Sequence, residues 1–99
     1  MSIDVEWQDE HGKTLTRYEG PELTRALVER AEPTSVCLRF IDPYGNTVFN
    51  QRQLPLLVGE LQALKSRTRD GQRDVIEALL AFLRSAGDQV HTYVKFVGD

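Results

Sequence analysis

The sequence is poor in the residues that metal, disulfide and phosphate chemistry require. Its 99 residues include one cysteine, Cys37, and two histidines, and no glycine-rich phosphate-binding pattern occurs. A lone cysteine cannot form an intramolecular disulfide and is typical of a reducing compartment. His11 and His91 lie far apart, and neither has a second ligand at a metal-like spacing. We therefore expect no metal, no cofactor and a cytoplasmic location.

Long apolar runs and excess positive charge are also missing. No run approaches the roughly 20 apolar residues that a transmembrane helix needs. Twelve basic against fifteen acidic residues give a net charge of −3, which argues against nucleic-acid binding because phosphates need concentrated positive charge. The sequence therefore predicts neither a membrane nor a nucleic-acid partner, and its mild acidity favours a basic protein partner.

The residues that are present fit one folded domain, and we expect it to span residues 1–99. Hydrophobic residues make up 40% and charged residues 27% of the chain, as in ordinary globular proteins. Alternating apolar and polar residues predict strands at 2–8, 14–18, 36–41, 47–49 and 90–97. Helical spacing of apolar residues predicts helices at 21–31 and 54–66, and a third that follows Gln72 and ends near Gly87.

The order of these elements predicts the fold class. Asp42-Pro43-Tyr44-Gly45-Asn46 has turn chemistry, so we expect strands 36–41 and 47–49 to form a hairpin. The order ββαββααβ lacks strict βαβ alternation. It predicts an α+β fold in which a largely antiparallel sheet of about five strands has helices packed on one face.

None of the reactive side chains stands in a catalytic pattern. Cys37 lies in a predicted strand with no neighbouring histidine, so we expect a buried, inert thiol. The pairs Asp4 with Glu6 and Asp9 with Glu10 fit the solvated face and turn of a strand hairpin better than an acid–base dyad. We therefore predict no catalytic residues and no enzyme.

Aromatic residues are the better candidates for function. Turn chemistry explains the neighbours of Tyr44 but gives Tyr44 itself no structural duty, and tyrosine is enriched at protein interfaces. Trp7 is a further candidate but the one we expect in the core. The predicted partner-binding residues are the aromatic anchors Tyr18, Tyr44 and Tyr93, with the acidic residues Asp4, Glu6, Asp9 and Glu10 as steering charges.

Two short stretches carry a resemblance. Residues 40–50, FIDPYGNTVFN, and residues 92–99, TYVKFVGD, resemble a group of small uncharacterised bacterial proteins. The resemblance implies a bacterial cytosolic protein and implies no activity. In general character the chain is also similar to the immunity proteins that neutralise secreted bacterial toxins.

Three functional hypotheses follow. The first is a non-enzymatic protein-binding module, an inhibitor or immunity-type protein whose acidic surface and aromatic anchors contact a basic toxin or enzyme. The alternative is a small-molecule-binding domain or minor enzyme with a pocket between sheet and helices, in which His91, Tyr93 or Arg39 supplies polar groups. The third is a homodimer formed by edge-strand pairing.

Overall fold

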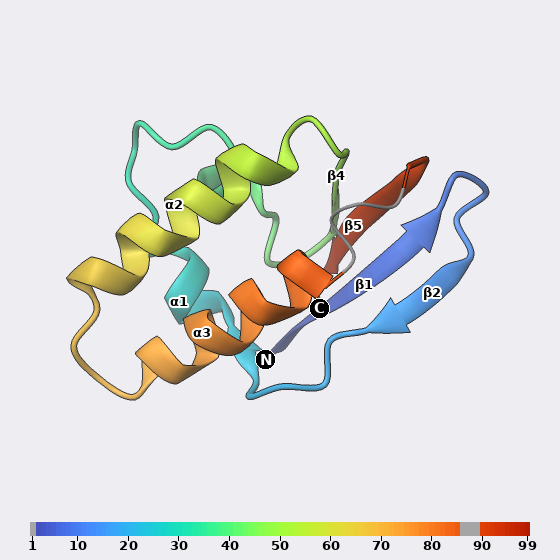
Figure 1. Ribbon diagram of the computed structural model, residues 1–99. Helices are drawn as coiled ribbons and strands as arrows, with labels where there is room; N and C mark the ends of the chain where they lie inside the picture. Colours follow the sequence, from blue (N-terminus) through green and yellow to red (C-terminus); the bar gives the residue numbers. More distant parts are fainter. Residues whose placement is uncertain (1, 86–89) are drawn as a thin grey trace.

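The computed structural model describes residues 2–85 and 90–99 and confirms the predicted fold class. The strands form one antiparallel sheet in the order β2-β1-β5-β4, and β3 pairs with β1. Their bounds are β1 Ser2–Asp9, β2 Thr14–Arg17, β3 Leu23–Thr24, β4 Asn46–Phe49 and β5 Thr92–Val97. The helices are α1 Arg25–Val28, α2 Leu54–Arg67 and α3 Gln72–Ser85, with a 3-10 turn η1 at Leu38–Phe40. Figure 1 shows all three helices on one side of the sheet.

The period of two along β1 and β5 decides which face of the sheet is buried. Ile3, Val5 and Trp7 point into the core, whereas the residues between them face the open side of the sheet. Trp7 is only 1% exposed and its Nε1 donates to the carbonyl of Phe82 at 3.3 Å, which confirms its place in the core. The leucine-rich stripes of α2 and α3 join the same apolar cluster. Side chains of the described strands and helices therefore pack together between the sheet and the helices.

Several predicted elements are confirmed. The strands near residues 2–8 and 14–18, the strand that ends at Val97 and the helix near 54–66 are all present. The third helix follows the predicted loop, but its predicted end near Gly87 lies outside the described residues. Within residues 2–85 and 90–99, no helix combines the length and the apolar character that crossing a bilayer requires.

The predicted helix at 21–31 is wrong in extent. Leu23 pairs with Ile3 as part of β3, and only the single turn of α1 follows. The side chain of Thr24 accepts a hydrogen bond from the N–H of Leu27 and so begins the helix four residues later than predicted. Strand pairing of Leu23 takes this part of the chain out of the helix.

The predicted strand at 36–41 and its hairpin with 47–49 are wrong. The carboxylate of Glu60 on α2 accepts the backbone N–H groups of Val36, Cys37 and Leu38, at 2.6, 3.1 and 2.8 Å. With these donors occupied, the segment curls into η1 instead of pairing in the sheet. β4 pairs instead with β5, more than 40 residues further along the chain.

Candidate functional site

Exposed large apolar side chains are concentrated in one stretch of the sequence, residues 36–56. Of the seven large apolar residues exposed among the described residues, five fall between residues 36 and 56, and each is 50–57% exposed. We call these residues together the 36–56 face; they are Val36, Phe40, Tyr44, Val48 and Leu56, of which Val48 lies on the open face of the sheet and Leu56 on α2. Exposed apolar patches are typical of interaction sites, because solvent contact of such side chains is unfavourable.

Hydrogen bonds hold the three chain segments of the 36–56 face together. The N–H of Val36 reaches Glu60, which lies one helical turn after Leu56 on α2. The N–H of Asp42 donates to the hydroxyl of Thr47 on β4 at 2.9 Å. The loop before β4 is thereby attached to both α2 and β4, which lie on the same side of the molecule in Figure 1.

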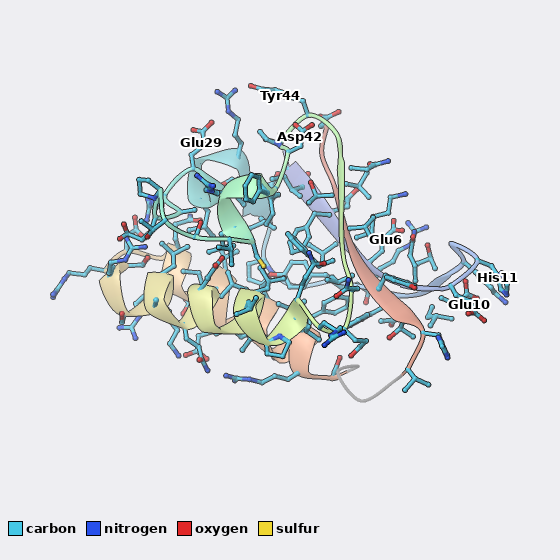
Figure 2. All side chains as sticks on the ribbon, turned by 90° about the horizontal axis from the view of Figure 1, so that it is seen from above. Glu6, Glu10, His11, Glu29, Asp42 and Tyr44 are labelled. Atoms are coloured by element: carbon cyan, nitrogen blue, oxygen red, sulfur yellow. The ribbon has the colours of Figure 1, made fainter. Side chains whose placement is uncertain are left out.

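Tyr44 occupies the apex of a fixed turn. Its N–H donates to Asp42 Oδ1 at 2.9 Å, and the end of the described chain pairs with the turn. The N–H of Gly98 donates to the carbonyl of Gly45 at 2.7 Å, and that of Asp99 donates to the carbonyl of Pro43 at 3.0 Å. Figure 2 shows Tyr44 at the outer edge of the molecule, on this turn.

Arginine side chains cover both exposed rings of the face. The guanidinium of Arg25 lies 5.0 Å from the ring centroid of Tyr44 and also donates to its hydroxyl oxygen. Glu29, four residues further along the chain, forms an ion pair with Arg25, and Oε1 of Glu29 lies 2.6 Å from Nε of Arg25. The guanidinium of Arg39 lies 4.5 Å from the ring centroid of Phe40. These cation–π contacts hold the rings in fixed positions.

A shallow hollow lies between α1 and the segment that follows η1. It has a volume of about 220 Å³, and Glu29 and Arg39 stand at its edge. Its apolar lining residues are Val28, Ala31, Leu38, Ile41 and Pro43. The hollow therefore offers a place for an apolar side chain next to the Tyr44 turn.

Of the other predicted anchors, Tyr18 makes internal contacts, whereas Tyr93 lies on the open face of the sheet, diagonally across from Val48. Tyr18 is half-buried with its ring edge-on to Phe82, and its hydroxyl donates to the carbonyl of Pro21 at 2.7 Å. Burial raises the pKa of the Tyr18 hydroxyl above its ordinary value. Tyr93 is half-buried on the open face of the sheet, opposite Gln8. The contacts of Tyr18 are those of a structural residue.

The acidic residues do not form one patch with Tyr44. Asp4 and Glu6 lie on the open face of β1, where Glu6 sits between its cross-strand neighbours Arg17 and Lys95. Figure 2 shows Glu10 on the β1–β2 turn, which projects in a different direction from the Tyr44 turn. The negative charge of Glu6 is thus partly offset by flanking positive charge.

Asp9 holds the β1–β2 turn. Its Oδ1 accepts hydrogen bonds from the backbone N–H groups of Lys13 and His11, both at 2.9 Å. These hydrogen bonds, of which the one from Lys13 has the larger effect, lower the pKa of Asp9 below its ordinary value of 3.8. Because the pKa of Asp9 is lower in the folded state, its carboxylate stabilises the turn at pH values above the ordinary pKa. That stabilisation is lost as the pH falls through the lowered pKa.

We expect this turn to titrate in acid. The amide chemical shifts of His11 and Lys13, followed by NMR, should move together with a midpoint below pH 3.8. In Asp9→Ala this transition should be absent. A midpoint at or above 3.8 would contradict the role assigned to Asp9.

The polar groups named for a small-molecule pocket do not converge. His91 and Tyr93 line a hollow of about 230 Å³ beside Arg52, whereas Arg39 lines the separate hollow next to α1. His91 also comes within 3.9 Å of Glu10, which lies 3.7 Å from His11. Even so, the described part of the chain contains no group of three His, Cys, Asp or Glu residues arranged to hold a metal ion.

Cys37 is buried, as expected. Burial raises the pKa of its thiol, and the negative charge of Glu60 raises it further. Less of the thiolate, which is the nucleophilic form, is therefore present at neutral pH than for a free cysteine.

Sequence reasoning missed four of the five residues of the 36–56 face. The sequence assigns Val36 and Phe40 to the predicted strand 36–41, Val48 to the strand 47–49 and Leu56 to the helix 54–66, without indicating that they are exposed. Comparisons with protein-family models, curated proteins and solved structures find no match for this chain. A functional proposal therefore depends on the geometry of the surface.

Proposed function

We propose that this protein is a non-enzymatic protein-binding module whose contact surface is the 36–56 face. The observation that carries the proposal is that five of the seven large apolar residues exposed among the described residues fall within residues 36–56, while the buried apolar side chains of the sheet and helices form one core cluster. When a partner covers exposed apolar groups, binding is favoured by roughly 25 cal/mol per Å² of apolar surface that is buried. A filled core leaves the surface as the place where recognition occurs.

Tyr44 is the central anchor of the proposed contact. Tyrosine and arginine dominate the binding energy of protein interfaces, especially when their conformations are fixed before binding. Tyr44 meets both conditions, because its turn is hydrogen-bonded to the end of the described chain and its ring lies beneath Arg25. Little conformational entropy remains to be lost when a partner covers it.

The charges around Tyr44 favour basic groups on the partner. Glu29 and Asp42 lie beside the turn, and the backbone of Asp99 is bonded to it. Asp4, Glu6, Asp9 and Glu10 add longer-range attraction, which speeds an encounter more than it tightens a complex. An inhibitor or immunity-type protein in a bacterial cytoplasm, acting on a basic toxin or enzyme, is the biological role that we propose.

Site-specific photocrosslinking tests the proposal. The photoreactive amino acid benzoylphenylalanine replaces Tyr44 or Phe40 in the cells that naturally produce the protein. We expect one discrete protein adduct shared by both positions. The control is Leu15 on β2, which is 48% exposed but lies outside the face. The proposal fails if neither position gives a protein adduct, or if Leu15 gives the same adduct.

A further inference from the structure

The free edge of β4 has backbone groups ready to pair. β4 is the last strand of the path β2-β1-β5-β4. The N–H of Gly98 donates to the carbonyl of Gly45, so the antiparallel alternation directs the backbone groups of Thr47 and Phe49 toward β5. The N–H and C=O groups of Asn46 and Val48 therefore point to the free edge. Within residues 2–85 and 90–99, neither residue makes a backbone hydrogen bond outside the β4–β5 pairing.

The two edges of the sheet differ in how they are protected. β2 has an irregular register opposite Trp7 and Gln8, and the charged residues Lys13 and Arg17 lie at its ends. Such irregularities and charges discourage pairing with another chain. β4 is Asn-Thr-Val-Phe, with no charge, no proline and no irregularity in its pairing. Only its short length limits pairing at this edge.

The ends of β4 carry opposite charges. Asp42 precedes the strand, and Asp99 is bonded to the same turn. Arg52 follows the strand and is exposed. When two copies of β4 pair antiparallel, the acidic start of one copy lies beside the basic end of the other. This segment is therefore complementary to itself in charge as well as in hydrogen bonding.

The surface beyond the strand ends is also self-complementary. A two-fold axis at Thr47 places residue 44 of one copy opposite residue 50 of the other. Asn50 and Arg52 line the hollow of about 230 Å³ at the end of β4. The Tyr44 turn of each copy would thus lie beside this hollow on its neighbour, as an isologous interface requires.

We infer that a second copy of this chain docks along the free edge of β4, beside Val48 and Tyr44 of the 36–56 face, with the two β4 strands pairing antiparallel across a two-fold axis at Thr47. This inference rests on the proposed function because it uses residues of the same face; a second copy and the basic partner proposed above would then compete for these residues. A standard interface covers about 800 Å² on each partner, which is roughly one seventh of the 5846 Å² surface of this chain. Covering Val48, Phe40 and Tyr44 together would contribute to that area.

Light scattering after size-exclusion chromatography tests this inference on the whole chain. At loading concentrations on the order of 10 to 500 µM, suited to a small interface, we expect a mass approaching twice 11.3 kDa. Val48→Lys should weaken the dimer at least tenfold, because it places two charges at the axis. The matched control Leu15→Lys, on the other edge strand, should leave the dimer unchanged.

Two further variants check the register. Val48→Pro removes an outward N–H without removing a bond to β5, and it should also abolish the dimer. Arg52→Glu places a carboxylate beside Asp42 of the second copy and should weaken the dimer, most strongly at low salt. Far-ultraviolet circular dichroism should show that each variant is folded.

The outcomes separate this inference from the proposed function. A monomer at every concentration, or a Val48→Lys protein that dimerises like the wild type, overturns the inference. If the chain is a monomer but Tyr44 and Phe40 crosslink to a different protein, the inference falls and the proposed function stands. If the chain is a monomer and neither position gives an adduct, both fall.

Discussion

Replacing Glu60 by alanine is expected to lower the free energy of unfolding by about 2 to 4 kcal/mol. Its carboxylate accepts three consecutive backbone N–H groups, those of Val36, Cys37 and Leu38. Each hydrogen bond to a charged group contributes about 1.5 to 3 kcal/mol, and the three are not additive because they share one carboxylate. Without Glu60 the three N–H groups lose their common acceptor, and the part-buried ones of Cys37 and Leu38 must find another partner.

Urea unfolding followed by circular dichroism measures this loss. Glu60→Gln keeps one acceptor oxygen and should fall between the wild type and the alanine variant. Glu77→Ala is the matched control: its carboxylate makes an exposed ion pair with Lys65 at 2.6 Å, and such pairs add little to stability. Hydrogen exchange should quicken at Val36, Cys37 and Leu38 in Glu60→Ala. Equal stability of Glu60→Ala and Glu77→Ala would refute the role given to Glu60.

Gly98→Ala is expected to cost about 1 to 3 kcal/mol of stability through overpacking. A Cβ at this position would lie 2.5 Å from the carbonyl carbon of Pro43 and 2.7 Å from the carbonyl oxygen of Asp42. Both are backbone atoms of the Tyr44 turn, so the clash cannot be relieved by a side-chain rotation. The turn and the end of β5 must separate, which weakens the bond between Gly98 and Gly45.

Gly59→Ala is the control with the opposite expected sign. Gly59 lies inside α2 with no atom within 4 Å of the added Cβ, so alanine should stabilise the helix by about 0.5 to 1 kcal/mol. Thermal or urea unfolding of the two variants compares the same chemical change at two positions. If both variants were destabilised equally, close packing at Gly98 would not be the cause.

Some residues of the candidate site could be identified from the sequence, and others could not. Tyr44 could be found from sequence because the turn chemistry around it was local and left its ring unexplained. Phe40 and Val36 could not be found from the sequence. Residues 36–41 alternate as in a strand, and nothing local in the sequence reveals that the carboxylate of Glu60 holds this segment in a loop instead. Tyr18 was a candidate anchor by residue type alone, and only the structure places its ring against Phe82.

The sequence by itself determined the α+β class, the long amphipathic helices and the central strand β1. These features depend on periodic patterns within one segment, and the burial of Trp7, Val5 and Ile3 follows from that pattern directly. Tertiary structure alone decided that residues 36–41 are no strand, that β4 pairs with β5, and that Val36 and Phe40 are exposed. The physical reason is that backbone N–H groups bond to any acceptor within reach, and the acceptor here, Glu60, lies more than 20 residues away in the sequence.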